Sequence, residues 1–384
     1  MHDEPQGASA GGGGGIVEHP AIAVLSVKPG RAAVLASVLR CRGFRSRHFV
    51  NARVLLNAAR QFVPVAIITD AELLTDPLVE ACAQAVREST GAFLVTLQHR
   101  EGERNSPAVD AVLDPDRDAD ELAQELHRLL YDTSWRQRLK RALREDGFRL
   151  AYQPIVHPDG SPSGLHEVLV RLHDSARGEI MPGDFLPPAD RLGLRRHIDH
   201  WVMQHALDTI TQHSSDRSPT LFVKLFPETI LTADFFDWLT RQLRRRRTDD
   251  GRLVIELPCS DVMATPETYL PLAAELRTHR CAIALGHYAP DDPAGMHQDF
   301  PADYLMLAPA LMRGLADSHA RQRYVQAVIS HARRAGARTI ATHVQNPQVM
   351  THLWQAGVDY VQGYFLHAPS PELWQPEAIT TDLP

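Results

Sequence analysis

The sequence has few cysteines and no long apolar run. Four cysteines occur among 384 residues, and none of them belongs to a Cys-x-x-Cys pair. This scarcity excludes a disulfide framework or a zinc knuckle and is typical of a reducing compartment, so we expect a cytoplasmic protein. No stretch approaches the roughly 18 apolar residues that a membrane-spanning helix needs. We therefore expect no membrane insertion.

An excess of positive charge is also absent. Lys and Arg number 40 against 47 Asp and Glu, which gives a formal net charge of −7. A protein drawn to nucleic acid by its overall field would be basic, so we expect no nucleic-acid partner. With 44% hydrophobic and 23% charged residues, the composition is that of globular domains, and the length predicts two or three of them.

The first part of the chain predicts a small α/β domain. Residues 1–19 hold five consecutive glycines and few apolar residues, which indicates a disordered Gly-rich tail. Residues 20–130 alternate short aliphatic runs with amphipathic stretches such as 31–40 and 118–130, the pattern of a parallel sheet covered by helices on both faces. We expect a doubly wound (βα)5 domain with strands at residues 21–27, 46–50, 63–69, 92–97 and 109–113.

The second part has the rhythm of a β/α barrel. Residues 131–147 place Trp135, Leu139 and Leu143 on one face of a charged segment, which predicts a linker helix. Residues 148–384 then show eight strand-like runs that mostly alternate with helix patterns. This predicts a TIM-like β/α barrel with its functional site at the carboxyl ends of the strands. The expected strands are residues 149–153, 165–171, 221–225, 253–257, 281–285, 304–307, 339–341 and 360–362.

A series of short motifs in the second part is more specific than its rhythm. Residues 152–156 read YQPIV, 167–171 read EVLVR, 182–187 read PGDFLP and 357–365 read GVDYVQGYF. In this order and spacing they resemble the EAL domain family over residues 149–369. The resemblance implies a β/α barrel that binds cyclic di-GMP at its strand ends and, in active members, hydrolyses it with two metal ions.

The metal ligands that the resemblance implies are only partly present. Glu167 and Glu256 stand at two carboxylate positions of the family, whereas Lys224 replaces its Asn on the third strand. Two carboxylates cannot balance two divalent ions, so we expect a degenerate domain that holds no metal cofactor and is not an enzyme. An alternative is a single-metal site made by Glu256 with His287 and His343. The remaining replacements are Cys259, Gly286, His287, Met306, Ala308 and Thr342.

The resemblance also implies that the nucleotide-binding surface is largely kept. Arg171 matches an arginine that reaches a phosphate, Leu169 would lie under a base, and Asp199 would accept hydrogen bonds from a guanine edge. The full set of expected cyclic di-GMP contacts is Gln153, Glu167, Leu169, Arg171, Asp199, His343, Gln362, Gly363 and Tyr364.

Structural roles are open alternatives for several of these residues. A lysine or arginine at a barrel mouth can pair with a carboxylate instead of meeting a ligand, and a glycine near a strand end can serve only a close backbone approach, as at Gly363. The pairs to be weighed are Lys224 with Glu167 or Glu256, and Arg171 with Asp174 or Asp199.

Within the family, the chain is most similar to the FimX-like regulators of type IV pili. It shares EVL in place of EAL, the Ile-Asp-x-Trp-Val pattern and LWQAG at residues 353–357. The resemblance implies a catalytically inactive cyclic di-GMP receptor and scaffold in pilus, motility or biofilm control, with a PilZ-type adaptor or a pilus motor protein as partner. His343 and Gln345 replace a Phe and a Glu of that branch, which favours the alternative of a protein-interaction scaffold that binds neither metal nor cyclic di-GMP. A working phosphodiesterase with a rearranged metal site is the remaining alternative.

The first domain resembles a response-regulator receiver with incomplete chemistry. Asp70 follows the third strand, at the phosphoacceptor position, and Thr96 matches the switch hydroxyl. Ser26 and Val27 stand where receivers need an acidic pair, and Asp114 stands where they need a lysine. We expect a pseudo-receiver that is not phosphorylated and serves homodimerisation or partner docking. The alternative for Asp70 is a helix cap or a turn.

A run of four arginines occupies residues 244–247. It could form a patch for an anionic partner, but such runs are usually solvated helix ends. We interpret it as a helix end.

Overall fold

The computed structural model describes residues 21–41, 44–90, 92–98, 109–114, 119–174, 178–213, 218–246, 251–290 and 300–374. The tail predicted at residues 1–19 lies outside these ranges. The chain divides into two units, Met1–Trp135 and Arg136–Pro384. This division falls between the domain limits predicted at residues 130 and 148.

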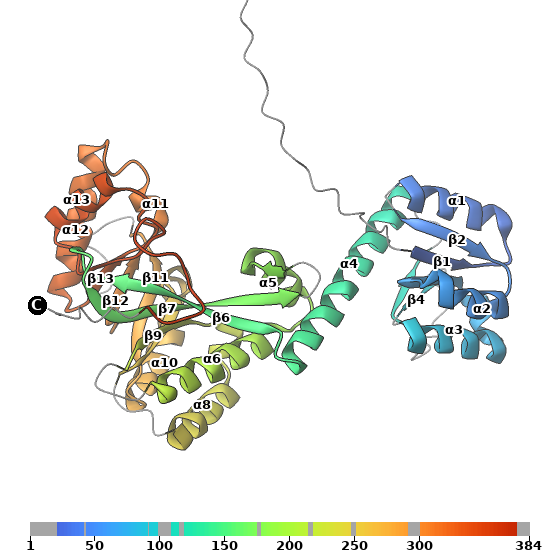
Figure 1. Cartoon of the computed structure of the whole chain (residues 1–384), viewed down its shortest axis with the longest axis horizontal. Helices are drawn as coiled ribbons and strands as arrows, with labels where there is room; N and C mark the ends of the chain where they lie inside the picture. Colours follow the sequence, from blue (N-terminus) through green and yellow to red (C-terminus); the bar gives the residue numbers. More distant parts are fainter. Residues whose placement is uncertain are drawn as a thin grey trace, which may run out of the picture. The chain divides into compact units, whose positions relative to one another are not determined.

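The first unit is built on a parallel five-stranded sheet (Figure 1). The strand order is β2-β1-β3-β4-β5, and all four pairings are parallel. The five strands predicted from the sequence lie within a few residues of these. Aliphatic runs typical of strands buried on both faces mark β1, β3 and β4, whereas the edge strand β2 reads RSRHF and is mostly exposed or half-buried. The strands are β1 (Ala21–Leu25), β2 (Arg45–Phe49), β3 (Ala66–Asp70), β4 (Phe93–Leu97) and β5 (Ala111–Leu113).

Helices cover both faces of this sheet. Successive side chains of a strand point to opposite faces, so Ile22 and Val24 pack in one apolar cluster with α1, while Ala23 and Leu25 pack in another with α2 and α3. The predicted doubly wound arrangement is confirmed by these two clusters. The helical segments are α1 (Pro29–Cys41), α2 (Ala52–Phe62), η1 (Ala71–Thr75) and α3 (Pro77–Thr90).

A single helix, α4 (Ala119–Arg144), includes both stretches that the sequence predicts as separate helices. It continues because its residues include neither glycine nor proline, the two residues that most often end a helix. Arg128 also pairs with Glu125 and Asp132, one turn away on either side.

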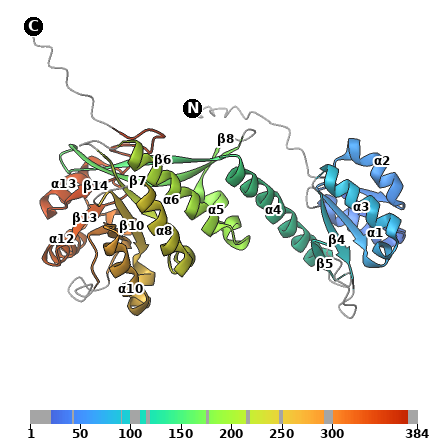
Figure 2. The ribbon, with the colours of Figure 1, turned by 90° about the horizontal axis from the view of Figure 1, so that it is seen from below.

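The second unit contains a closed barrel of eight strands. Figure 2 labels β6, β7, β10, β13 and β14 of this barrel. Around the barrel the order is β6-β14-β13-β12-β11-β10-β9-β7, and β7 pairs with β6 to close it. Seven strands are parallel, and β6 is antiparallel to both of its neighbours. The strands are β6 (Phe148–Val156), β7 (Pro162–Asp174), β9 (Thr220–Lys224), β10 (Leu253–Pro258), β11 (Ala282–Tyr288), β12 (Tyr304–Leu307), β13 (Arg338–Ala341) and β14 (Tyr360–Val361).

The sequence predicts these eight strands but not two features of their arrangement. The antiparallel direction of β6 cannot be recognised from its own residues, because it depends on which neighbouring strands it pairs with. The short strand β8 (Gly178–Ile180), which pairs with β7 outside the barrel, has only three residues, too few to show a periodic pattern.

The helices of the second unit are α5 (Pro182–Arg191), α6 (Arg195–Gln212), α7 (Pro227–Ile230), α8 (Ala233–Arg246), α9 (Cys259–Ala264), α10 (Pro266–Thr278), α11 (Pro309–Met312), α12 (His319–Arg334) and α13 (Pro347–Ala356).

One apolar layer fills the barrel and fixes what lies above it. Each of the eight strands contributes one side chain to this layer, and side chains alternate between the inside and the outside of a barrel. The residue two places toward the carboxyl end of each parallel strand therefore also lies on the inward side. The layer consists of Ile155, Leu165, Phe222, Val254, Ala284, Met306, Ile340 and Tyr360.

Among the helices that the structure describes, none combines the length and the hydrophobicity that crossing a bilayer would take.

The backbone around Gly363 gives a test of the barrel's packing. A Cβ atom added at Gly363 would lie 2.0 Å from the carbonyl oxygen of Val344 and 2.5 Å from its nitrogen. Backbone atoms cannot move aside as a side-chain end can, so we expect Gly363→Ala to lower the free energy of unfolding of the barrel by about 1–3 kcal/mol. Urea unfolding followed by tryptophan fluorescence measures this. Gly183→Ala, with no atom within 4 Å of its added Cβ, is the control, and equal stability of the two variants would contradict the packing argument.

Candidate functional site

The carboxyl ends of the barrel strands hold a cluster of polar side chains. They follow directly from the inward alternation: Glu167 lies two residues beyond Leu165, Glu256 two beyond Val254, and Gln362 two beyond Tyr360. On antiparallel β6, Gln153 pairs with Glu167 in register. We call the side chains of Gln153, Glu167, Lys224, Glu256 and Gln362 the barrel mouth.

Glu167 is held in place by a neighbouring amide. The Gln362 side chain donates a hydrogen bond to Glu167 Oε2 at 2.6 Å. The pKa of Glu167 is raised to about 7, chiefly by burial and then by the negative charge of Glu256, with Gln362, Lys224 and Arg171 opposing the rise. Two carboxylates thus face one another at the mouth, where a cation would stabilise both.

Glu256 carries a buried carboxylate with one oxygen unpartnered. Its Oε1 lies 3.3 Å from Nζ of Lys224, so the pairing of Lys224 with Glu256, one of the two weighed from the sequence, is confirmed. Oε2 has no hydrogen-bond partner among the described residues, although Glu256 is only 3% exposed. An unpartnered buried carboxylate oxygen is costly, and a bound cation would satisfy it.

Gly286 makes room for this carboxylate. A Cβ atom at Gly286 would lie 2.1 Å from Glu256 Oε1. The carboxylate therefore occupies space that any side chain at position 286 would need. From the sequence, Gly286 is only the loss of an expected metal ligand. The space that it gives to the Glu256 carboxylate cannot be predicted, since the two residues lie on adjacent strands 30 positions apart.

The other inward positions at this level carry no carboxylate. Ala308 and Thr342 are buried, and the Thr342 hydroxyl donates to the carbonyl of Leu307 at 2.7 Å. Within the described ranges, no group of three or more His, Cys, Asp or Glu side chains gathers closely enough to hold a metal ion. The alternative site of Glu256 with His287 and His343 is therefore wrong as a preformed cluster.

Arg171 lies beyond Glu167 and Leu169 on β7. Its guanidinium is 3.5 Å from Glu179 on β8 and donates to the Val170 carbonyl at 3.0 Å. Neither partner weighed from the sequence is used, because Asp174 pairs with Arg138 at 3.0 Å instead. The sequence could not indicate Glu179, since β8 was not predicted. The phosphate contact of Arg171 stays a prediction.

Asp199 is engaged within the fold. Its Oδ2 accepts hydrogen bonds from the Phe226 N–H at 3.0 Å and from the Thr229 hydroxyl at 2.5 Å, and the residue is 3% exposed. Burial raises the pKa of Asp199 to about 7. The guanine contact expected of this residue stays a prediction, and its visible role is to tie α6 to the start of α7.

The remaining predicted contacts surround the mouth. Gln153 is buried and donates to the His367 carbonyl at 3.2 Å, and Leu169 is partly buried. Gly363 lies against the Val344 backbone, which is the structural role weighed for it. Tyr364 is 64% exposed. It therefore presents a ring that a planar ligand can stack on.

A cavity opens beside the end of β13. It has a volume of about 490 Å³ and lies between α11 with its following loop and the start of α13. His343 and Gln345, singled out from the sequence, both line it. His343 and His287 also share a positive φ of 56°, unusual for residues with a side chain. The other lining residues are Pro309, Met312, Arg313, Gly314, Ala316, Asp317, Asn346, Gln348 and Val349.

Asp70 of the first unit is enclosed by its neighbours. It ends β3, is 3% exposed, and accepts hydrogen bonds from the Ser26 hydroxyl at 2.6 Å and from Arg31 at 3.1 Å. Its side chain makes no capping hydrogen bond to η1, so the cap considered for it is not formed. Sequence reasoning missed Arg31, which supplies a positive charge to this carboxylate from the first turn of α1.

The chain is similar to known proteins over the second unit. A model of the EAL domain family matches residues 136–369. The cyclic di-GMP phosphodiesterase PdeF of Escherichia coli is 25% identical over 252 residues, 65% of this chain and 34% of the relative, so the chain spans about a third of that relative's length. The FimX EAL domain of Pseudomonas aeruginosa bound to c-di-GMP has a TM-score of 0.57 at 26% identity, covering 62% of this chain and 97% of that domain. The Xanthomonas citri FimX EAL domain in complex with c-diGMP gives 0.60 at 25%, with 66% and 98% covered.

These relatives overturn two expectations drawn from the sequence. The expectation that the barrel is not an enzyme is wrong, because relatives at 22–27% identity are named cyclic di-GMP phosphodiesterases. The expectation of no metal is wrong on the same ground, because phosphodiester hydrolysis of this kind relies on divalent ions. The physical error was to require a complete protein ligand set. One Mg²⁺ ion is commonly held by one or two carboxylates, with water and substrate phosphate supplying the other oxygens.

The residues at the mouth fit one such ion. Glu167 and Glu256 would hold it, and the unpartnered Oε2 of Glu256 is the oxygen that most lacks a partner. The Lys224 ammonium, whose side chain is 45% exposed, would have to turn toward solvent. A bound ion would supply a polarising charge to a phosphate oxygen and a more acidic water.

The space at Gly286 yields a prediction about Lys224. We expect Gly286→Ala to displace the Glu256 carboxylate and break the Lys224–Glu256 pair, at some cost in stability because the carboxylate is buried. Lys224 should then react faster with acetic anhydride, as measured by mass spectrometry. Lys28 and Lys140, the other two lysines of the chain, are internal references. An unchanged ratio of Lys224 to reference labelling would show that the carboxylate does not lie over Gly286.

The buried Asp199 predicts a pH effect on stability. Its pKa is about 7 in the folded protein and near 3.8 when unfolded. The unfolded chain therefore loses this proton first, and the contribution of Asp199 to the free energy of unfolding falls as pH rises from about 4 to about 7. We expect Asp199→Asn to lose this fall, so that the variant gains on the wild type between about pH 5 and about pH 8 in urea unfolding. Asp237→Asn, an exposed site, is the control; a constant difference between wild type and Asp199→Asn would contradict the burial argument.

Proposed function

The chain belongs to the EAL domain family, and from that premise we propose that its barrel binds cyclic di-GMP at the barrel mouth. The observation that carries the proposal is the placement of cationic and amide side chains around one opening at the carboxyl ends of the strands. Similarity to FimX EAL domains solved with c-di-GMP supports it, because nearly the whole of each of those domains is covered.

The phosphates of the ligand need cations, and the mouth offers two. Lys224 projects an ammonium that is 45% exposed by side-chain area, and Arg171 lies farther along the adjacent strand β7. The partner of Arg171, Glu179, is 61% exposed by side-chain area, so exchanging it for a phosphate would leave no buried charge behind. Arginine suits phosphate because its fork of N–H groups can donate two parallel hydrogen bonds.

The two guanines need flat surfaces and amide or carbonyl partners. Tyr364 and Phe365 are exposed beside the mouth and can stack on bases. The cavity lined by His343, Gln345 and Asn346 offers an imidazole and two amides to a base edge. His343 and Gln345, which replace a Phe and a Glu of the FimX-like branch, would therefore contact the bases through polar groups.

Hydrolysis of cyclic di-GMP, and the divalent ion that it would need, can be tested in the same experiment as binding. Because relatives named phosphodiesterases share this barrel, Glu167 and Glu256 would hold one divalent ion, which would supply a polarising charge, and Arg171 would orient the phosphate. The residues of the chain would orient the phosphate and exclude water from the back of the mouth, where the apolar layer lies directly beneath.

We further propose a signalling role in the cytoplasm that passes through partners. The first unit has the strand order 2-1-3-4-5, which receiver domains share. Both oxygens of Asp70 are engaged, by Ser26 and by Arg31, which supports a receiver-like unit used for docking or homodimerisation without phosphorylation. A PilZ-type adaptor or a pilus motor protein in type IV pilus, motility or biofilm control is the partner class that FimX similarity suggests.

Calorimetric titration of cyclic di-GMP into the full chain, with and without Mn²⁺, tests the proposal. We expect binding in both cases, tighter with Mn²⁺ because a divalent ion held by Glu167 and Glu256 would offset the negative charges of the carboxylates and of the ligand phosphate. Chromatography of the mixture for the linear dinucleotide then measures hydrolysis. No heat at any ligand concentration would refute the proposal and leave a protein-interaction scaffold.

Arg171→Ala tests the phosphate contact. We expect affinity for cyclic di-GMP to fall about 10- to 100-fold, the range for a lost hydrogen bond to a charged group. Thermal melting is measured beside it, because Arg171 is only 5% exposed and its truncation also removes buried packing. Arg334→Ala, an exposed arginine on α12, is the matched control. Wild-type affinity in Arg171→Ala would remove this residue from the site.

A further inference from the structure

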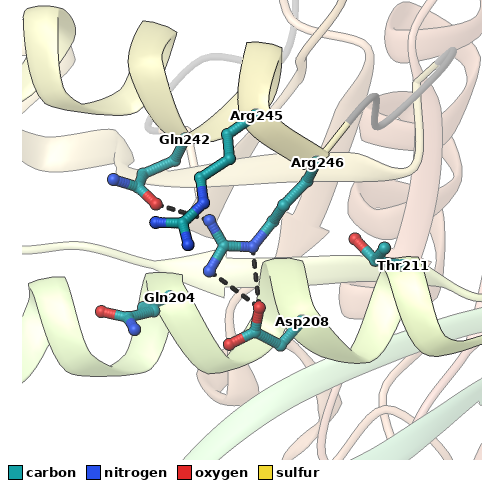
Figure 3. A pocket seen from close by; sticks show the side chains of 6 residues that line it. All are labelled: Gln204, Asp208, Thr211, Gln242, Arg245 and Arg246. Carbon is teal, nitrogen blue, oxygen red and sulfur yellow. Dashed lines mark hydrogen bonds and ion pairs between the residues drawn. The ribbon is translucent and has the colours of Figure 1, made fainter.

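A polar groove runs between helices α6 and α8, on residues that the barrel mouth does not use. Figure 3 shows side chains from both helices projecting into it, and its volume is about 530 Å³. From α6 come Gln204, Asp208 and Thr211, which stand at i, i+4 and i+7 and so share one helix face. From α8 come Gln242, Arg245 and Arg246.

One arginine of this groove is fixed by its neighbours. Nε and Nη2 of Arg246 both lie 2.7 Å from Asp208 Oδ1, and its Nη1 donates to Gln242 Oε1 (Figure 3). The Arg246 side chain is only 12% exposed. This pair ties the end of α8 to α6 and leaves the Gln242 amide N–H groups available to a ligand.

The other arginine has no such partner. Within the part of the chain that the structure describes, Arg245 forms no ion pair or hydrogen bond, and the same is true of Arg241 and Arg244 on the same helix. All three are exposed. Among the described lining residues Asp208 is the one acid, and its charge is already balanced by Arg246. The groove therefore carries an excess positive charge on a chain whose net charge is −7.

We propose that this groove docks an acidic segment of a partner protein. Its donors are spread along α6 over about 10 Å, from Gln204 to Thr211, at 1.5 Å per residue. A segment with several carboxylates can meet Arg245, the Gln204 and Gln242 amides and the Thr211 hydroxyl together. A single phosphate would reach fewer of these donors at once, and Gln204, Thr211 and Arg245 are exposed, so their individual contributions are small. The inference is independent of cyclic di-GMP, because none of the residues that line the groove belongs to the barrel mouth or to the predicted cyclic di-GMP contacts.

Fluorescence anisotropy with a fluorescein-labelled oligoglutamate peptide tests this on the full chain. We expect binding that weakens with salt, as screening of exposed charges requires. Arg245→Glu should weaken it about tenfold or more, because the substitution reverses the unpaired charge. Arg334→Glu is the matched control: it reverses another exposed arginine in the last turn of a helix, α12, and should leave the affinity unchanged.

Asp208→Asn makes the test independent of folding damage. Removing the one acid uncovers the charge of Arg246, so we expect the peptide to bind several-fold more tightly, a gain that misfolding cannot produce. Far-ultraviolet circular dichroism checks that each variant keeps its helices.

Three results would overturn the proposal. The first is equal loss of affinity in Arg245→Glu and Arg334→Glu, which would mean that any surface arginine serves. The second is unchanged or weaker binding in Asp208→Asn. The third is displacement of the peptide by low concentrations of inorganic phosphate, or tighter binding of a single-stranded oligonucleotide, since either would assign the groove to a different anion.

Discussion

Closure of the barrel is the constraint on which the candidate site depends. Because β6 pairs with both β7 and β14, the eight strands form a ring, and each side chain must point either into it or away from it. The apolar layer takes one inward position per strand. The side chain at the next inward position of each strand must then lie at the mouth. Residues as distant in sequence as Glu167 and Gln362 therefore come within hydrogen-bond distance.

Electrostatics at the mouth follow from this enforced proximity. The charge of Glu256 raises the pKa of Glu167, whose carboxylate accepts a hydrogen bond from the Gln362 amide, while the Glu256 carboxylate pairs with the Lys224 ammonium. The Glu256 carboxylate can lie where it does only because position 286 has no side chain. The positions of Lys224, Gly286 and Glu256 therefore depend on one another. What the mouth can bind follows from the three residues together and not from any one of them.

Much of the fold could be predicted from the sequence. Five strands of the first unit and eight of the barrel lie within a few residues of the runs that indicate them, and most of these runs are aliphatic because buried parallel strands favour such residues. The partners of charged residues could not be predicted in the same way. Arg171 pairs with Glu179 on a three-residue strand, and Arg31 reaches Asp70 from another element, because both contacts depend on which backbone segments come together in space.

The family, the strand positions and the identity of the groups at the mouth follow from residue type and spacing along the chain. The antiparallel direction of β6, the hydrogen bonds that tie Asp199 to the start of α7, and the pairing of Arg246 but not of Arg245 depend on contacts between segments that are distant in sequence. Neighbouring arginines are alike in a sequence. They differ here because one faces Asp208 across the helix contact and the other faces the open groove.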